Sequence, residues 1–252
     1  METEAIIIIP SRLGSTRLPN KPLADINGKP MVIRVAEQAK KSQAGRVIVA
    51  TGDDAIISLA HEHGLEAIKT YKEHNSGTDR IFEAYGSLPA NERSKYIINL
   101  QGDLPNIEPE YIAKVLNILK NSPADIATLV SEVKNEDEAT NPSIVKAILT
   151  NCQQNKYNAL RALYFTRATA PTGGATLYNH IGIYAYKKDA LKRFVNLPVS
   201  YLETHEKLEQ LRALENDMSI IAAIVNEAPI AIDTPDDLLT IADFYKNQNL
   251  NN

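Results

Sequence analysis

The sequence predicts an α/β protein: a mostly parallel β-sheet covered by helices on both faces, in three layers. Short runs of β-branched residues alternate along the chain with amphipathic stretches of helical spacing. No linker rich in proline, glycine or serine divides the 252 residues, and no internal repeat is visible. We therefore expect a single domain over residues 1–252, with a smaller lobe inserted at about 160–217, where the pattern changes.

Each element is expected from its local pattern. The expected strands are 5–9, 46–50, 66–70, 96–100, 125–132, 144–150, 181–187 and 219–225. The expected helices are 30–43, 54–63, 77–87, 108–120, 188–195, 199–215 and 235–246. Pro30 and Pro235 fit a first helical turn, where a missing N–H removes no hydrogen bond. Thr234 fits a helix start, and Gly64 fits a helix end.

Composition limits the classes of function. The formal net charge of −4 offers no global positive field for DNA or RNA, so we expect no nucleic-acid partner and only local recognition of phosphate. The apolar run at 5–9 ends at Pro10, which is too short for a membrane span or a signal peptide. The one cysteine, Cys152, allows no disulfide within the chain and is expected in a surface turn. These features predict a cytoplasmic protein without membrane insertion.

A basic loop directly after the first strand is the first candidate for chemistry. Residues 10–22 contain three cations, Arg12, Arg17 and Lys21, together with hydroxyl residues and one glycine. Ligands of open α/β sheets bind outside the carboxyl ends of the strands, which is where this loop begins. Backbone N–H groups in such a turn can line an anion nest, and the cations can bind a triphosphate. The loop matches neither the Walker A pattern nor the dinucleotide-binding glycine pattern.

Two aspartates form a second constellation. Gly102 allows a sharp turn after the strand at 96–100, which leaves Asp103 at the edge of the sheet. Asp233 lies just before the last helix and could be the second carboxylate on the same Mg²⁺, since this ion takes one or two carboxylates together with phosphate oxygens. Ordinary structural explanations remain: Asp103 could be a turn residue, and Asp233 could start a helix whose N-terminus favours acids.

Two further polar positions each allow two interpretations. The loop at 74–80 opens a helix, and Ser76 or Thr78 could cap it or read the edge of a nucleobase. His180 precedes an apolar strand, where a neutral ring could bind a sugar hydroxyl or serve only as a structural cap.

These pieces, in this order, resemble the Kdo cytidylyltransferases (CMP-Kdo synthetases) of lipopolysaccharide synthesis, where Kdo is 3-deoxy-manno-octulosonate. The likeness spans nearly the whole chain. The motifs that carry it are the Ser11–Pro22 loop, Ser76-Gly77-Thr78-Asp79-Arg80, Gln101-Gly102-Asp103, Phe165-Thr166-Arg167-Ala168-Thr169, His180-Ile181-Gly182-Ile183-Tyr184, Leu208-Glu209-Gln210-Leu211-Arg212 and Asp233-Thr234-Pro235. The resemblance implies the nucleotidyltransferase (Rossmann-like) type of sheet, a smaller lobe for substrate and dimerisation, and a homodimer.

The resemblance also implies a role for each matched position. The CTP phosphates are expected on Arg12, Ser15 and Lys21, in the loop that also holds Arg17. Cytidine is expected near Ser76, Thr78 and Arg80, and Mg²⁺ on Asp103 and Asp233. The acidic eight-carbon sugar is expected on Gln101, Arg167, His180, Tyr184, Glu209 and Gln210, with the Arg167 guanidinium facing its carboxylate.

The chain departs from the family pattern in three places. Leu104 stands where the family commonly has an acid after Gln-Gly-Asp, so the role of that carboxylate is missing. The motif Arg-Ala-Thr-Ile-Pro appears as Arg167-Ala168-Thr169-Ala170-Pro171. The segment from there to His180 is unusually short.

The implied reaction is attack by the anomeric 2-hydroxyl of the sugar on the α-phosphorus of CTP, with release of pyrophosphate. Asp103, Asp233, Lys21 and Arg12 are expected to carry it, and no general base stands out. The alternatives are a cytidylyltransferase for 8-amino-Kdo or a sialic acid, and a nucleotide-binding regulator without catalysis. A nucleotide-sugar glycosyltransferase is disfavoured, because its metal usually binds an Asp-x-Asp motif and this chain has Gln101-Gly102-Asp103.

Overall fold

The computed structural model describes residues 4–15, 17–74, 76–151 and 159–250. Cys152 lies outside these residues, so its expected surface position stays a prediction. The chain forms two compact units. The first unit is Met1–Ser94, Asn99–Ile112 and Pro229–Asn252, and the second is Lys95–Ile98 and Ala113–Ala228.

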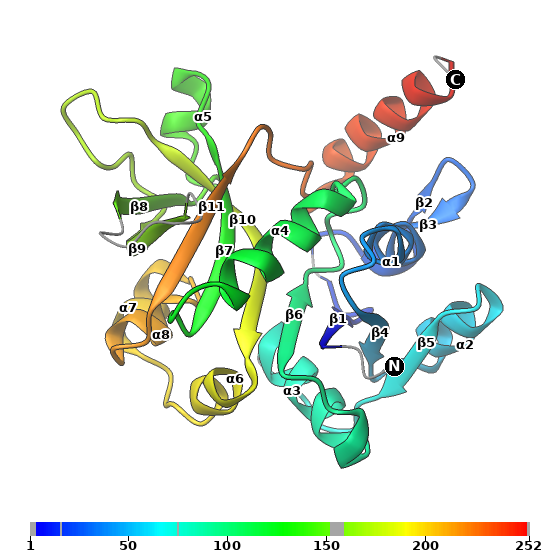
Figure 1. Ribbon diagram of the computed structural model, residues 1–252. Helices are drawn as coiled ribbons and strands as arrows, with labels where there is room; N and C mark the ends of the chain where they lie inside the picture. Colours follow the sequence, from blue (N-terminus) through cyan, green and yellow to red (C-terminus); the bar gives the residue numbers. More distant parts are fainter. Residues whose placement is uncertain (1–3, 16, 75, 152–158, 251–252) are drawn as a thin grey trace. The chain divides into compact units, whose positions relative to one another are not determined.

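The first unit is built on parallel strands (Figure 1). Its strands are β1 (Ala5–Ser11), β4 (Arg46–Thr51), β5 (Glu66–Lys69) and the carboxyl end of β6 (Tyr96–Leu100), in the order β5-β4-β1-β6. Its helices are α1 (Met31–Lys41), α2 (Asp54–Glu62), α3 (Gly77–Ser87), the start of α4 (Pro109–Lys120) and α9 (Pro235–Leu250), with short 3-10 turns η1 (Lys21–Leu23) and η2 (Ala90–Glu92). The chain moves outward from β1 to β5 and returns through α3 to β6 on the other side of β1. The strand order therefore reverses between β1 and β6, the place where open α/β sheets bind ligands.

Apolar packing in this unit holds the loop that follows β1 against its neighbours. Every residue of β1 is buried. The loop after β1, a hairpin and α9 then pack together through a cluster of apolar side chains, namely Leu18, Ile26, Met31, Ile232 and Ile241. The hairpin joins β2 (Asp25–Ile26) to β3 (Lys29–Pro30), with Asn27 at φ 49° and Gly28 at φ 79°. Two positive φ values are what a two-residue Asn-Gly hairpin turn requires, so this element, which we did not predict, had a clear signal.

The second unit mixes parallel and antiparallel strands. Its strands are β7 (Ile126–Glu132), β8 (Lys146–Asn151), β9 (Ala159–Thr166), β10 (Tyr178–Lys187) and β11 (Ile220–Val225), in the order β10-β7-β11-β9-β8. Its helices are α5 (Glu136–Thr140), α6 (Lys188–Val195), α7 (Tyr201–Glu206) and α8 (Leu211–Glu215), with the remainder of α4. β7 pairs parallel with β11, whereas β10, β9 and β8 pair antiparallel with their neighbours.

The α/β class is confirmed, and so are several helix boundaries. Pro235 is the first residue of α9, and the Thr234 hydroxyl accepts a hydrogen bond from the Asp237 N–H as an N-cap. Gly64, at φ 63°, follows the end of α2. Pro30 does not belong to the first turn of α1 as expected, because it is the capping residue before Met31.

Three expectations in the second unit were wrong. Strand β9 was not predicted, and β10 begins at Tyr178 rather than at 181. The helix expected at 199–215 is two short helices, because Lys207 adopts a left-handed conformation at φ 58° and ends α7. The break folds the chain back, so that Arg212 donates to Glu203 from 2.6 Å in a pair that is almost fully buried.

No helix among the described residues is long and apolar enough to cross a membrane. The expected organisation as one domain with an inserted lobe at 160–217 stays a prediction. Those residues belong to the second unit.

Candidate active site

The loop after β1 and the turn after β6 lie against each other. A Cβ atom on Gly102 would come 3.2 Å from the carbonyl oxygen of Pro10. A Cβ on Gly77, the first residue of α3, would come 3.1 Å from the Pro10 ring and 3.3 Å from the Gln101 amide. Both distances are tighter than ordinary contacts, so glycine allows these three segments to meet in the first unit.

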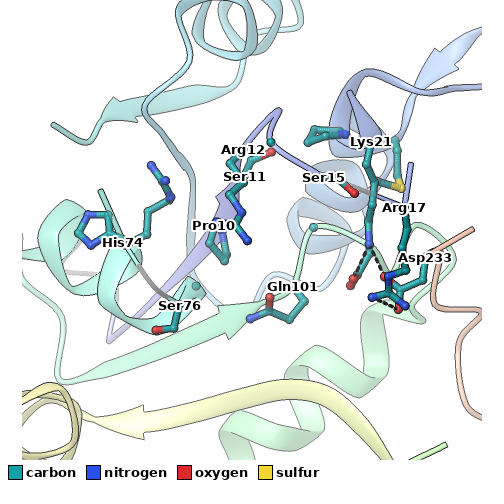
Figure 2. Close-up of a pocket in the computed structure, with 17 residues that line it drawn as sticks. Pro10, Ser11, Arg12, Ser15, Arg17, Lys21, His74, Ser76, Gln101 and Asp233 are labelled. Atoms are coloured by element: carbon teal, nitrogen blue, oxygen red, sulfur yellow. Dashed lines mark hydrogen bonds and ion pairs between the residues drawn. The ribbon is translucent and has the colours of Figure 1, made fainter. Parts of the chain in front are cut away.

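A cavity of about 380 Å³ opens where these segments meet (Figure 2). It is polar and partly open to solvent. Its walls include Arg12, Ser15, Arg17, Lys21, Ser76, Arg80, Gln101, Asp103 and Asp233, all of them residues that the sequence suggested for nucleotide, metal or sugar. Thr78 is the one predicted nucleotide residue that does not line it.

Lys21 joins the two predicted metal carboxylates at one end of the cavity. Its Nζ lies 2.9 Å from Asp103 Oδ2 and 3.0 Å from Asp233 Oδ1. Arg17 adds a longer contact of 3.2 Å to Asp233 Oδ2. Burial lowers the pKa of Lys21, but attraction and hydrogen bonding to Asp103 and Asp233 outweigh it and leave this pKa raised. Lys21 is therefore a firmly charged cation at this point.

Backbone contacts fix the two carboxylates in place. The Ile232 N–H donates to the carbonyl oxygen of Asp103 at 3.0 Å, which ties the segment before α9 to the turn after β6. Asp237 Oδ2 accepts from the N–H of Asp233 at 2.9 Å and from the N–H of Thr234 at 2.8 Å. The first turn of α9 thus acts as a clamp on the backbone of Asp233.

The pair of carboxylates fits a small divalent cation. Both reach the same ammonium nitrogen, so their oxygens converge on one point. The donors are hard oxygens, and Mg²⁺ is bound by one or two carboxylates that are completed by substrate phosphates and water. Within the described residues no group of three or more His, Cys, Asp or Glu side chains could hold a metal alone. A two-carboxylate site would therefore need the ligand oxygens of a bound nucleotide.

Arg12 and Arg80 are two further cations in the lining of the cavity. Arg80 is buried, and it donates a short hydrogen bond to the Thr70 hydroxyl. Burial lowers the pKa of Arg80, and the nearby charge of Arg12 lowers it further. Two guanidinium groups that repel each other favour an acceptor-rich ligand between them.

Both hydroxyls that the sequence suggested for a base make hydrogen bonds within the protein, and Ser76 also lines the cavity. Ser76 is the N-cap of α3: its Oγ accepts from the Asp79 N–H at 3.1 Å and donates to Asp79 Oδ2 at 3.0 Å. Thr78 is buried and accepts a hydrogen bond from Asn99 Nδ2 at 3.1 Å. Ser76 thus caps α3, and Thr78 binds a buried neighbour.

Replacing Ser76 with alanine is expected to lower the free energy of unfolding by about 1 kcal/mol, the usual loss when an N-cap is removed. Urea unfolding measures this loss. Asn135, which caps the exposed helix α5 by accepting from the Glu138 N–H, gives a matched variant, Asn135→Ala. If Ser76→Ala left stability unchanged but weakened CTP binding, the hydroxyl would be a ligand contact rather than a cap.

The predicted sugar residues other than Gln101 belong to the second unit. His180 and Tyr184 lie on β10 with ring centroids 5.3 Å apart, at a shift in the register with β7. The Thr128 hydroxyl donates its proton to the carbonyl oxygen of Ile183 at 2.8 Å. His180 Nε2 lies 3.0 Å from the Thr128 hydroxyl oxygen, so the histidine is the donor in the hydrogen bond between these two side chains. Burial lowers the pKa of His180 to about 3, so the ring is neutral near pH 7.

Tyr184 interacts with Glu209, another residue predicted to bind the sugar. Burial raises the pKa of Tyr184, and electrostatic interactions with Tyr186 and Glu209 raise it further. Gln210 is buried, and within the described residues its Nε2 has no hydrogen-bond partner. A buried amide without a partner is costly, which favours a polar ligand at this place.

Arg167 is held by backbone oxygens rather than by a carboxylate. Its Nη1 donates to Pro142 at 2.9 Å, and its Nε donates to the carbonyl of Glu206 at 3.2 Å. The Glu206 carboxylate accepts instead from the Arg167 N–H, Thr166 Oγ1 and Tyr164 OH. The guanidinium is thus oriented by neutral groups and keeps its charge for an anion.

Comparison with known proteins identifies the family. The cytidylyltransferase family model matches residues 6–220. A 3-deoxy-manno-octulosonate cytidylyltransferase of Bartonella henselae is 52% identical over 238 residues, covering 94% of this chain and 97% of that protein. The chain belongs to the 3-deoxy-manno-octulosonate cytidylyltransferase family. The family member from Rhizobium etli is 50% identical over 235 residues, covering 93% of this chain and 92% of that protein.

Solved structures agree with this assignment. A CMP:2-keto-3-deoxy-manno-octonic acid synthetase complexed with CTP has a TM-score of 0.89 and 36% identity, and the match covers 97% of this chain and 99% of that one. The 4-diphosphocytidyl-2C-methyl-D-erythritol synthase of Anaerococcus prevotii, at 13% identity and a TM-score of 0.63, shares the fold. The nucleotidyltransferase type of fold is confirmed.

The structure adds the surroundings of Leu104 and two lining residues to what the sequence suggested. Leu104, where an acid is common, is 3% exposed and belongs to the core, so it offers no group to the cavity. Ser11 and His74 line the cavity, although neither was assigned a role. Ser11 belongs to the loop at 10–22 and His74 to the loop at 74–80. Their closeness in sequence to the predicted binding residues was the only indication that they line the cavity.

Proposed function

We propose that this chain transfers a cytidylyl group from CTP to Kdo, giving CMP-Kdo and pyrophosphate. Its membership in the 3-deoxy-manno-octulosonate cytidylyltransferase family supports this reaction. The observation that carries the proposal in the structure is the convergence of Arg12, Arg17 and Lys21 with Asp103 and Asp233 on one cavity. A nucleoside triphosphate and a divalent cation need that combination of charges.

The reaction forms a bond between the anomeric oxygen of the sugar and the α-phosphorus of CTP, and breaks the bond from that phosphorus to the β-phosphate bridging oxygen. Negative charge grows on the departing pyrophosphate. Lys21, Arg12 and Arg17 line this cavity and would supply positive charge to the departing group. The proton of the sugar hydroxyl passes to water as the bond forms, and we assign no base among the described lining residues.

Asp103 and Asp233 are the proposed ligands of a divalent cation, which we infer to be Mg²⁺. When bound, such an ion supplies positive charge at the phosphates. Its fit rests on the two converging carboxylates described above. The backbone clamp from Asp237 keeps Asp233 in place for this role.

The proposed sugar contacts are Gln101 in the first unit and Arg167, His180, Tyr184, Glu209 and Gln210 in the second. Arg167 has the charge and the fixed orientation to bind the sugar carboxylate. The neutral ring of His180 and the hydroxyl of Tyr184 suit sugar hydroxyls. A homodimer and a cytoplasmic location remain predictions from the family resemblance and the sequence.

The test is to incubate the purified protein with CTP, MgCl₂ and Kdo and to follow pyrophosphate release, in parallel with 8-amino-Kdo and N-acetylneuraminate. We expect release with Kdo and its loss on addition of EDTA, because the reaction needs the divalent cation. Release only with another sugar would keep the chemistry and change the substrate. CTP binding without turnover of any of the three would support the non-catalytic regulator instead.

A further inference from the structure

An aspartate outside the cavity is hydrogen-bonded to the basic loop at 10–22. The register of the sheet places it there, because Ser11 at the end of β1 lies opposite Thr51 at the end of β4. Leu13 and Asp53 each follow two residues later along their own chain segments. The Leu13 N–H donates to Asp53 Oδ2 at 3.0 Å. The backbone of the basic loop is therefore tied to the segment that follows the neighbouring strand.

Asp53 makes this bond instead of capping its own helix. It is the N-cap residue of α2, where an aspartate usually accepts a hydrogen bond from an N–H of the first turn. Within the described residues its side chain makes no such cap. The Asp53 N–H donates to the Thr51 hydroxyl at 3.1 Å, which fixes the backbone that carries the carboxylate. The carboxylate is thus held in a position where it binds another segment rather than α2.

The stretch of chain that Asp53 holds has little packing to fix it. Ser11 before the stretch and Leu18 after it are buried, whereas the described residues between them, 12–15 and 17, are exposed or half-buried. A loop of this kind loses conformational freedom when it binds a ligand, and that loss lowers the affinity. The hydrogen bond at Leu13 orders the backbone before the ligand arrives.

The Asp53 carboxylate holds the loop without adding negative charge to the cavity wall. Asp53 is not a lining residue, whereas Arg12 and Ser15, which flank Leu13 in the loop, both line the cavity (Figure 2). Burial lowers the pKa of Arg80 and the charge of Arg12 lowers it further, whereas the charge of Asp53 acts in the opposite direction. Asp53 is therefore also a nearby counter-charge for Arg80.

We propose that Asp53 is a positioning residue for triphosphate binding: its carboxylate holds the Leu13 N–H and so presets the part of the loop that carries Arg12 and Ser15. This inference rests on the proposed function, since it takes the triphosphate of CTP as the ligand of the loop.

The test is calorimetric binding of CTP and CMP, in MgCl₂, to the wild type, Asp53→Ala and Asp53→Asn. CTP depends on the loop more than CMP does, because it brings two more phosphates to the cations of the loop. We expect Asp53→Ala to lower the ratio of CTP affinity to CMP affinity by about tenfold, the worth of one hydrogen bond to a charged group. Asp53→Asn should keep this ratio within about twofold of the wild type, because its amide oxygen can still accept from the Leu13 N–H.

The direction of the change separates positioning from the other effects of the substitution. Loss of a negative charge near the cavity would favour the more highly charged CTP and so raise the ratio. A general loss of stability would weaken the binding of both nucleotides and leave the ratio unchanged. Asp54→Ala is the matched control, since Asp54 is the next residue, is 78% exposed and pairs with Lys69 at 2.6 Å. It removes the same charge from the start of α2 and should not lower the ratio.

Thermal unfolding shows whether each variant is folded. If Asp53→Ala does not fold, Asp53→Ser replaces it, because serine also suits an N-cap but is one atom shorter and loses the bond to Leu13. An unchanged ratio in the folded variant, or an equal loss in Asp53→Asn, would overturn the proposal. Binding is measured without Kdo, so a protein that binds CTP but does not turn it over refutes the proposed reaction and still tests this inference.

Discussion

Replacing Asp103 with asparagine is expected to lower kcat by about 10²–10³-fold, the size seen when one preorganised electrostatic contact to a transition state is removed. Asparagine keeps the shape and one oxygen but loses the negative charge that a divalent cation needs. The affinity for CTP should fall less, because the cations of the loop at 10–22 remain. Steady-state pyrophosphate release gives kcat and KM, and Mn²⁺ binding followed by electron paramagnetic resonance should weaken in parallel.

Asp243 provides the control for this substitution. It is an aspartate on α9 whose side chain is 72% exposed, and it pairs only loosely with Lys246 at 3.3 Å. Asp243→Asn should leave kcat and Mn²⁺ binding unchanged. An Asp103→Asn enzyme with normal kcat would remove Asp103 from the metal site and leave the turn-residue explanation.

That the residues proposed for the nucleotide line one cavity could be predicted, because sheet geometry brings most of their segments together. The loop after β1 and the turn after β6 follow neighbouring strands, and ligands of open α/β sheets bind at the ends of such strands, so their polar residues were expected at one edge. The glycines at 77 and 102 allow the close approach, and the motif pattern already contained them. Asp233 arrives from the far end of the chain, yet the hydrogen bond from Ile232 to Asp103 ties it to the same edge.

The sequence could not show whether a polar residue caps a helix or faces a ligand. A serine before a helix can cap it or face a ligand, and only the position of the Asp79 N–H shows that Ser76 caps α3. His74 was assigned no role, because its partner Glu83 is nine residues away along the chain. The two side chains meet only once α3 has formed. Pairings of this kind are absent from local sequence patterns.

The second unit was harder for a different reason. Its antiparallel strands do not follow the strand–helix alternation that identified the first unit. The segment of β9 contains the exposed residue Arg161 between apolar residues, so the sequence gave no continuous apolar run there. The stretch at 199–215 has good helical residues throughout, and only tertiary contacts, the burial of Leu208 and the Glu203–Arg212 pair, favour a break at Lys207.

Replacing Lys21 with methionine is expected to change two measurements in opposite directions. The value of kcat/KM for CTP should fall by about 10²–10³-fold, because a charged group aimed at the leaving pyrophosphate is lost while the alkyl stem is kept. Divalent-cation binding without nucleotide should become tighter than in the wild type. The reason is that Lys21 Nζ holds both carboxylates, at 2.9 and 3.0 Å, and so competes with a metal for the same oxygens. In the wild type, CTP would relieve this competition by attracting the ammonium to its phosphates.

Titration of Mn²⁺ with and without CTP measures both effects. Lys29→Met is the matched control: Lys29 also binds a carboxylate closely, Glu37 at 2.7 Å, but lies outside the cavity. It should change neither kcat/KM nor Mn²⁺ affinity. If Lys21→Met bound Mn²⁺ more weakly than the wild type, the lysine would be a support of the metal site rather than its competitor, and the order in which nucleotide and metal bind would have to be reconsidered. If instead metal binding tightened while kcat/KM stayed normal, Lys21 would have no part in stabilising the leaving group, and Arg12 and Arg17 would carry that charge alone.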